Sequence, residues 1–284
     1  MVSLEVMDKI APGGVYLCQV NENVSCGACC GLYNITDLSR EKLHRMLSER
    51  SAAFLKIARE IDAIIEFGEN TLAAENETRP YPEFYHCPYI GFIGNNGKRV
   101  GCLLHPAAEG NNSVDYRGLS YYGSMTCNIY FCPSYTVLSD NFKRVIRTAS
   151  QDWYSYGLII TENALINAFL SETEKIIQRK PDEKDVRDNP DFADIIRDFI
   201  GLKPSWPFRP VSDTPANYFF NDKLYDKKDA DYTKIRSASF TSLYNTIFKE
   251  LGSSFQADKD IRKAENMIEF LLKRLKKYNK ETIV

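Results

Sequence analysis

The sequence predicts a mainly α-helical protein with a small β-hairpin, in which an irregular cysteine-rich half precedes a helical half. Two observations support this fold class. All eight cysteines of the 284-residue chain lie between Cys18 and Cys132. Beyond Cys132, apolar residues recur at the three- and four-residue spacing of amphipathic helices. We therefore divide the chain into residues 1–135 and 136–284, and the sequence leaves open whether these two regions share one core.

Two helices are expected in the first region. Leu43, Met46 and Leu47 have helical spacing within residues 39–50. A second helix is expected at residues 52–67, where apolar side chains form a broad face and Gly68 has the position of a C-terminal cap.

A β-hairpin is expected at residues 89–104. Two short apolar runs there flank the sequence Gly-Asn-Asn-Gly, which is typical of a tight turn. Such a hairpin would bring Cys87 and Cys102 close together. Residues 107–125 are rich in Gly, Asn, Ser and Tyr and have little periodicity, so we expect a loop.

The second region is expected to be helical throughout. Capping residues, prolines and apolar stripes indicate five helices in it. Their expected limits are Ser139 to Gly157, Thr161 to Ile177, Asn189 to Gly201, Phe240 to Gly252, and Ile261 to Leu275. A proline-rich connection is expected at residues 203–215. Stripes of this kind ordinarily pack a helical core.

The charge balance gives no indication of a nucleic-acid or membrane partner. The 36 basic residues nearly cancel the 38 acidic residues, so no overall field attracts nucleic acid or anionic lipid. The N-terminus lacks the basic and apolar regions of a signal peptide, and no apolar run reaches the roughly 18 residues that a membrane span needs. We expect a cytoplasmic protein.

The compartment decides how the cysteines are interpreted. Reducing compartments disfavour durable disulfides, so metal ligation is the leading use. A secreted, disulfide-bonded protein is one alternative, because eight cysteines fit four bridges and Asn-x-Ser/Thr sequons begin at Asn23, Asn34, Asn76 and Asn111. Free thiols that pack as small apolar side chains are another.

The central motif is Cys-Gly-Ala-Cys-Cys-Gly at residues 26–31. Its small residues let the chain curl around an ion and let backbone N–H groups approach the sulfurs. Zinc binds four thiolates tetrahedrally at about 2.3 Å, and iron–sulfur clusters are also held by thiolates, so the motif does not choose between zinc and iron. Adjacent Cys29 and Cys30 favour a larger cluster or a two-metal site, because neighbouring side chains do not easily converge on one ion.

These residues resemble the YkgJ-like, or CxxCxxCC, family of cysteine-cluster proteins, which is described as a zinc- or iron-chelating domain and includes flagellin lysine N-methylases. The resemblance covers residues 18–135. It lies in the 26–31 motif followed by a helix, in Cys87-Pro-Tyr-Ile before a turn, and in Gly-Cys102-Leu-Leu. The chain departs from the family pattern after Cys102: His105-Pro stands in place of an Arg-Pro, and the next cysteine is delayed to Cys127 or Cys132.

The family pattern and the arrangement of a cysteine knuckle facing a hairpin together favour five ligands: Cys26, Cys29, Cys30, Cys87 and Cys102. Cys132 is favoured over Cys127 as the next ligand, because the proline after Cys132 holds its backbone extended, whereas Cys127 lies nearer the loop. Cys18 is expected to be a supplementary ligand or a core thiol. His105 is a further ligand candidate; a position beside the site or on the surface is the alternative for it and for His86.

Three functions are compatible with this sequence. The preferred one is a cysteine-ligated zinc or iron/iron–sulfur centre in a structural or redox role, with the helical region offering a surface to a protein partner. The resemblance implies a second, an S-adenosylmethionine-dependent protein-lysine N-methyltransferase, although the glycines at 91, 94 and 97 lack the spacing of a nucleotide-binding loop. The third is metal storage, delivery or sensing. The sequence does not determine the metal, its nuclearity, a substrate or the oligomeric state.

Overall fold

The computed structural model describes residues 3–75, 78–94, 97–215, 217–219, 225–235 and 242–279. Within these residues the protein is mainly α-helical with one two-stranded antiparallel sheet, which confirms the predicted fold class. Its helices and strands are α1 (Leu4–Ile10), α2 (Arg40–Phe54), α3 (Ile61–Ala74), β1 (Ile90–Phe92), β2 (Val100–Cys102), α4 (Gly123–Ile129), α5 (Ser134–Val137), α6 (Asp140–Ala149), α7 (Trp153–Ile159), α8 (Asn163–Ile177), α9 (Glu183–Asp188), α10 (Pro190–Ser205), α11 (Asn245–Glu250) and α12 (Asp258–Leu275). In this described part of the chain, no helix combines the length and apolar character of a membrane span.

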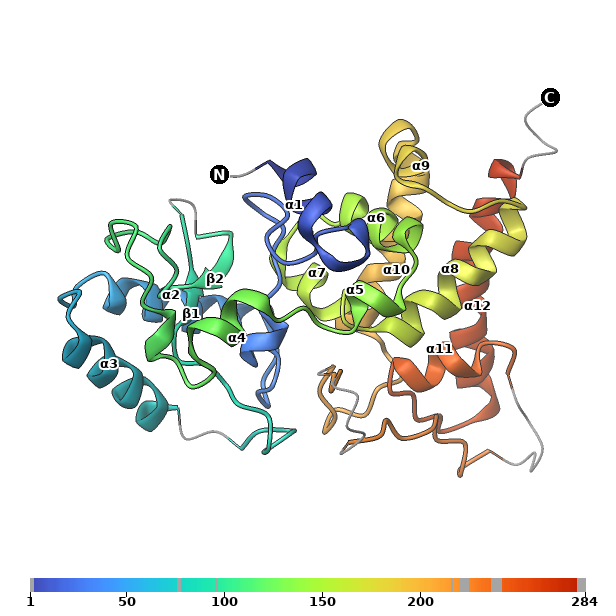
Figure 1. Ribbon diagram of the computed structural model, residues 1–284. Coiled ribbons are helices and arrows are strands. Elements are labelled where there is room, and N and C mark those ends of the chain that lie inside the picture. Colours follow the sequence, from blue (N-terminus) through green and yellow to red (C-terminus); the bar gives the residue numbers. More distant parts are fainter. Residues whose placement is uncertain are drawn as a thin grey trace.

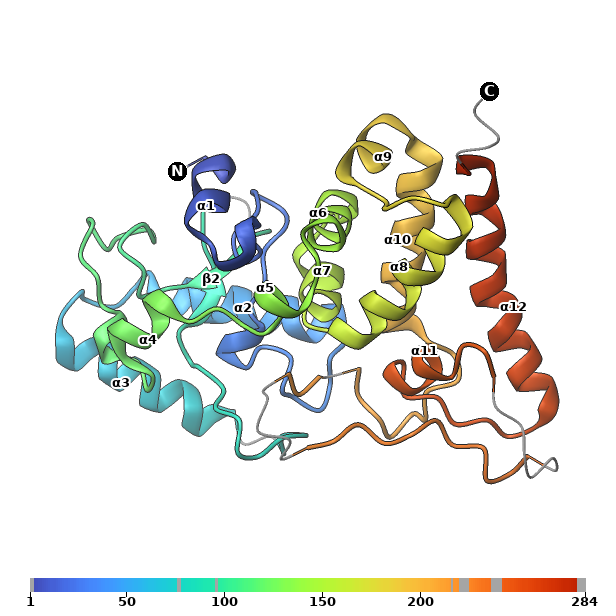
Figure 2. The same cartoon turned by 45° about the vertical axis from the view of Figure 1, so that its right-hand side comes forward.

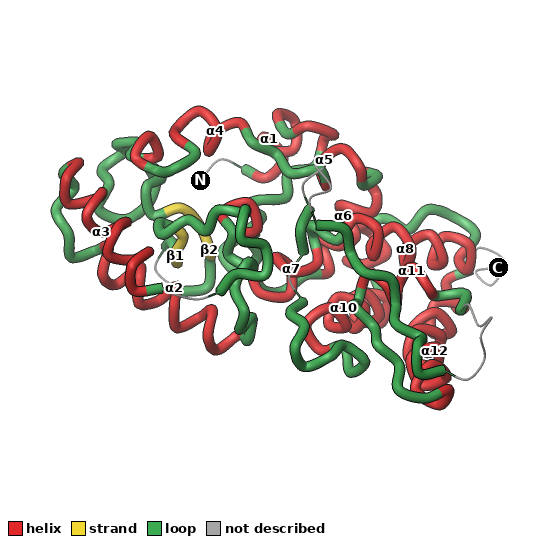
Figure 3. The backbone as a smooth tube through the Cα atoms, turned by 90° about the horizontal axis from the view of Figure 1, so that it is seen from below, coloured by secondary structure: helices red, strands yellow, loops and turns green. Residues whose placement is uncertain are grey.

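The cysteine-rich and helical regions occupy opposite ends of the molecule (Figures 1 and 2). Helices α2, α3 and α4 lie with the hairpin at one end, and α8 to α12 lie at the other. The N-terminal helix α1 lies between them, beside α6. Seen from below, the two strands are enclosed by the helices and loops of the first region (Figure 3).

The first predicted helix is confirmed, but the second is wrong in its limits. Ser39 caps α2 through a 3.3 Å hydrogen bond from the backbone N–H of Lys42. The helix continues to Phe54, the chain turns over residues 55–60, and α3 begins only at Ile61. Arg59 stabilises this break, because its guanidinium donates to the carbonyls of Phe54 at 2.7 Å and Ile57 at 2.9 Å. Helix α3 then runs through Gly68, the predicted cap.

The predicted hairpin is confirmed. Strands β1 and β2 pair antiparallel with Ile90 opposite Cys102. The sheet is tied to α2, because the N–H of Phe92 donates to the Ser51 hydroxyl at 2.7 Å. The expected loop at 107–125 is largely irregular, although α4 begins at its end and was not predicted. Two of the sequons begin with buried side chains, those of Asn34 and Asn111.

In the second region the predicted helices exist, but their ends differ from the predicted ones. Ser139 caps α6 as expected, yet α6 ends at Ala149, and Asp152 caps a separate helix, α7, that runs through Gly157. Helix α8 ends at Ile177 as predicted, but its N-cap is Glu162 rather than Thr161.

The later helices follow the same pattern. Helix α10 continues past Gly201 to Ser205, so its predicted end is wrong. Gly252 adopts a left-handed conformation after α11, close to the predicted end of that helix, whereas the expected start at Phe240 falls outside the described residues. Helix α12 spans all of the predicted stretch 261–275, and α5 and α9 were not predicted.

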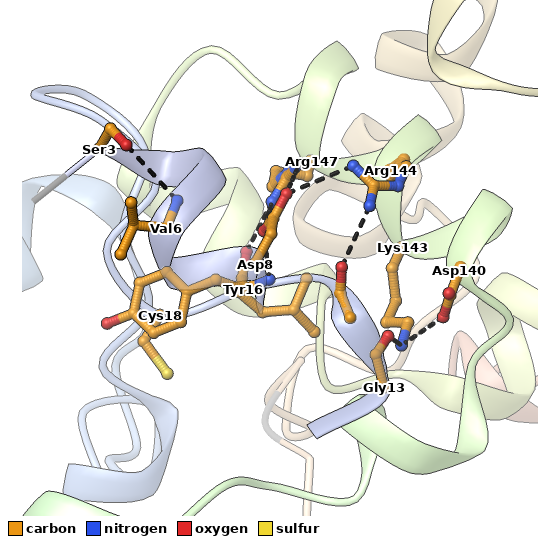
Figure 4. Close-up of polar contacts among 12 residues, drawn as sticks. Ser3, Val6, Asp8, Gly13, Tyr16, Cys18, Asp140, Lys143, Arg144 and Arg147 are labelled. Atoms are coloured by element: carbon orange, nitrogen blue, oxygen red, sulfur yellow. Dashed lines mark hydrogen bonds and ion pairs between the residues drawn. The ribbon is translucent and has the colours of Figure 1, made fainter. Parts of the chain in front are cut away.

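Polar contacts dock the N-terminal segment onto α6 (Figure 4). The Asp8 carboxylate accepts a 2.6 Å hydrogen bond from Arg147 and forms an ion pair with Arg144 at 3.3 Å. The buried Lys143 ammonium donates to the carbonyl of Gly13 at 2.6 Å and to that of Tyr135 at 2.9 Å. Because a buried ammonium needs such partners, these contacts hold the segment that leads into Cys18.

Hydrophobic packing crosses the boundary predicted at residue 135. The largest cluster joins Val15, Leu17 and Val24 to the buried faces of α6 to α12. A second cluster joins residues 28–100 to Trp153 and Leu158 of α7. Side chains from both predicted regions therefore pack together, and separate unfolding of the two regions stays a prediction.

Candidate metal centre

Cys18 and Cys26 are neighbours at the ends of a tight loop. The N–H of Cys26 donates to the carbonyl of Cys18 at 2.8 Å, and an antiparallel bridge joins Gln19 to Ser25. The loop is attached to the hairpin, because the N–H of Val100 donates to the Ser25 hydroxyl and the Gln19 amide donates to the Val100 carbonyl, each at 2.8 Å. Cys18 is therefore hydrogen-bonded directly to the first residue of the motif, although eight residues separate the two in sequence.

The 26–31 motif forms a short 3₁₀ turn at Ala28–Cys30. The turn ends at Gly31, whose φ of 76° lies in the left-handed region that favours glycine. As expected for a metal knuckle, a backbone N–H points at a sulfur: that of Ala28 lies 3.5 Å from Cys26 Sγ. The neighbouring thiol of Cys30 lowers the pKa of Cys29, and that of Cys29 raises the pKa of Cys30.

Cys87 and Cys102 lie beside Cys30. The N–H of Cys87 donates to the carbonyl of Cys30 at 2.8 Å, and Cys102 stands opposite Ile90 in the hairpin. Burial raises the pKa of each thiol to about 12, and the nearby Cys87 thiol contributes to the increase at Cys102. The hairpin therefore places Cys102 within electrostatic range of Cys87.

Cys127 and Cys132 lie near different cysteines. Cys127 is exposed on α4, where Sγ lies 3.4 Å from the Ser120 hydroxyl, and its charge raises the pKa values of Cys87 and Cys102. Cys132 is partly buried; burial raises its pKa, and the neighbouring Cys29 raises it further. Each residue thus lies within electrostatic range of different cysteines, so Cys127 and Cys132 need not compete for one position.

The histidines have partners of their own. The N–H of Ala107 donates to His105 Nδ1 at 3.0 Å, which places His105 in a turn. Buried His86 lies 2.8 Å from the carbonyl of Gly31 through Nδ1 and 2.7 Å from an Arg50 nitrogen through Nε2. Because a carbonyl only accepts, Nδ1 of His86 carries the hydrogen and Nε2 accepts from Arg50.

Sequence reasoning missed the group formed by Arg50, Glu75 and His86. Arg50 also donates to the carbonyls of Cys87 at 3.1 Å and Ile90 at 3.3 Å, and its Nε donates to the Glu75 carboxylate at 2.8 Å. Burial alone would raise the pKa of Glu75, but His86 and the Arg50 guanidinium beside its carboxylate lower it to about 2. No local pattern marks Arg50, because its role depends on loops far along the chain.

Tyrosines surround the cysteines, which sequence reasoning also missed. Tyr135 Oη lies 3.1 Å from Cys18 Sγ and accepts a 2.8 Å hydrogen bond from the N–H of Leu17. Burial strongly raises the pKa of Tyr135. Others within electrostatic range of a cysteine are Tyr16, Tyr33, Tyr85, Tyr89, Tyr122, Tyr130 and Tyr156. The sequence does contain a signal of these tyrosine neighbours, because a tyrosine lies close in sequence to nearly every cysteine.

The thiols are neighbours without forming a closed ligand cage. Across the part of the chain that the structure describes, no three His, Cys, Asp or Glu side chains converge as ligands of a single ion. All eight cysteines are free, and none is in a disulfide. The donor set nevertheless suits zinc and iron–sulfur clusters, because both are bound by soft thiolate sulfur.

The resemblance to the YkgJ-like family depends on the cysteine motifs of the sequence, and the geometry of the site does not test it. Comparison of the whole chain with protein-family models, with curated proteins and with solved structures found no match in any of the three.

Proposed function

We propose that this protein binds zinc or an iron–sulfur centre through its cysteines, in a structural or redox role. One observation carries the proposal: the fold gathers thiols from segments as distant as Cys18 and Cys132, whereas residues 133–284 contain no cysteine. Thiols that serve only as small apolar side chains would be expected in the helical core as well. Their confinement to one zone supports a shared ligand role.

The surroundings of the thiols suit a metal of this kind. Burial raises the pKa of Cys18 and Cys26, so these thiols stay protonated unless a cation compensates the thiolate charge. The N–H of Ala28 and the hydroxyl of Tyr135 are in place to donate to the sulfurs of Cys26 and Cys18. A bound metal would connect segments that are distant in sequence, and an iron–sulfur cluster would also supply one-electron chemistry.

The proposal includes a cytoplasmic location, because eight free thiols persist in a reducing compartment. The buried positions of Asn34 and Asn111 support it, since a glycan cannot be accommodated on a side chain inside the fold. A methyltransferase and a metal-storage protein stay as alternative functions, and the geometry of the described residues does not favour either one.

Metal analysis of protein purified without oxygen tests the proposal. We expect at least one equivalent of zinc, or iron with sulfide and visible absorption, and a marked loss of metal in Cys29→Ser. Leu165→Ala is the control, because Leu165 is fully buried in α8, far along the chain from the thiols, and its truncation destabilises the fold without removing a ligand. Full metal content in Cys29→Ser, or metal-free wild-type protein, contradicts the proposal.

A further inference from the structure

The backbone divides the cysteines into two groups. The hydrogen bond from Cys26 to the Cys18 carbonyl joins one pair, and the hydrogen bond from Cys87 to the Cys30 carbonyl joins another. Cys102 joins the second pair, because it stands in the hairpin opposite Ile90, which follows shortly after Cys87 in the chain. The adjacent residues Cys29 and Cys30 lie where the two groups meet.

Hydrophobic packing supports the same division. Cys18, Cys26 and Cys132 pack against the large cluster that includes the helical region. Cys87 belongs to a separate cluster with Phe54 and Leu104, and Cys30 and Cys102 pack against that cluster. A third cluster is contacted by cysteines of both groups, namely Cys26, Cys29, Cys30 and Cys132. The sulfurs at the two ends therefore lie in different surroundings.

Charge interactions assign the remaining cysteines. Among Cys18, Cys26, Cys29 and Cys132, each thiol lies within electrostatic range of the other three. We call these four the first thiol set. The second thiol set comprises Cys30, Cys87, Cys102 and Cys127. In this set, Cys87 and Cys102 lie within electrostatic range of each other, and each also lies within range of Cys30 and Cys127.

Cys29 is the link between the two sets. It directly precedes Cys30 in the 3₁₀ turn, and its charge also reaches Cys87. Neighbouring residues in a short 3₁₀ turn direct their side chains differently, so the turn at Ala28–Cys30 can present one sulfur to each set. Four thiolates complete the tetrahedral coordination of zinc and equally the ligand set of one iron–sulfur cluster.

We infer that the protein holds two metal centres, each formed when a metal draws together the sulfurs of one thiol set, with the two centres adjacent at Cys29 and Cys30. This inference rests on the proposed metal-binding function and deepens it. It gives Cys18 and Cys127 ligand roles equal to those of the motif cysteines. It also explains the consecutive cysteines as the junction between two centres.

Titration of reduced, metal-free protein with Co²⁺ tests the inference, because tetrahedral cobalt thiolates absorb visible light. We expect saturation at two equivalents. Cys18→Ser and Cys127→Ser should each saturate at one equivalent, and the double variant should bind less than one. Cys127 is exposed, so its replacement by serine leaves the apolar core intact.

Alkylation of the wild-type protein gives a second measurement that needs no variant. At one equivalent of Co²⁺, molecules in which Cys18 is protected from alkylation should also have Cys132 protected. Protection of Cys87 should likewise accompany protection of Cys102. Tandem mass spectrometry locates the alkylated residues. One equivalent at saturation with all eight thiols protected together overturns the two-centre inference but leaves the proposed function standing. The absence of any cobalt binding removes both.

Discussion

The hydroxyl of Tyr33, in the cysteine-rich region, lies directly against Gly157 of α7. A Cβ atom on Gly157 would stand 1.7 Å from this oxygen, which donates a 3.2 Å hydrogen bond to the carbonyl of Trp153. Tyr89 has the same relation to α3: its hydroxyl would meet a Cβ on Gly68 at 2.2 Å and donates to the carbonyl of Ile64 at 3.1 Å. Both glycines make room for a tyrosine on a helix surface.

This contact predicts that Gly157→Ala destabilises the protein by about 1–3 kcal/mol, because the methyl group and the Tyr33 hydroxyl cannot occupy the same space. Urea unfolding provides the measurement. Gly201→Ala in α10 is the matched control: a Cβ atom added there would meet nothing within 4 Å, so stability should stay unchanged or rise by up to about 1 kcal/mol. Equal effects of the two substitutions would refute the steric explanation.

Arg50 is expected to position the second thiol set. Arg50→Met removes the donors to the Cys87 and Ile90 carbonyls and leaves Glu75 without its ion-pair partner, so the free energy of unfolding should fall by about 3 kcal/mol. Cobalt affinity should fall at the second thiol set and persist at the first. Arg45→Met, an exposed position on the same helix, is the control and should change neither property. An equal loss of affinity at both sets would show that Arg50 supports the fold in general.

The acid sensitivity of the fold should depend partly on Glu75. Its pKa in the folded protein is about 2, below the ordinary 4.5, so its stabilisation is fully present above pH 4.5 and disappears as the pH falls toward 2. Glu75→Gln should therefore reduce stability by about 2–3 kcal/mol at pH 7 and by almost nothing near pH 2. Urea unfolding across this range measures the difference. Glu49→Gln, exposed on α2, should give a constant difference, and a constant difference for Glu75→Gln would count against the proposed pairing.

Metal removal should loosen the cysteine-rich region far more than the helical region, because a site built from distant segments couples binding to folding. Hydrogen exchange before and after chelation measures this. The amides of Cys26, Cys87 and Leu103, which bond across the thiol segments, should exchange at least about tenfold faster, while those in α8 and α10 should keep their protection. Equal loss of protection in α8 and α10 would mean that the two regions unfold as one unit, as the packing across residue 135 permits.

Local sequence signals predicted much of the secondary structure. The start of α2 at Ser39, that of α6 at Ser139, the hairpin and α12 follow from capping residues and apolar periodicity, which act within a few residues. Three of the errors concern Gly68, Gly157 and Gly201, which were expected to end helices. At Gly68 and Gly157, a distant tyrosine explains the glycine, and no local pattern contains that information.

The sequence by itself determined that the protein is mainly helical and that the thiols are confined to one half of the chain. Only the tertiary structure decided which thiols are neighbours. Cys18 meets Cys26 through a backbone bridge, and Cys127 reaches Cys87 and Cys102 through a helix that was not predicted. The physical reason is that periodicity and capping act along the chain, whereas ligand sets form between segments that meet only after the core has packed.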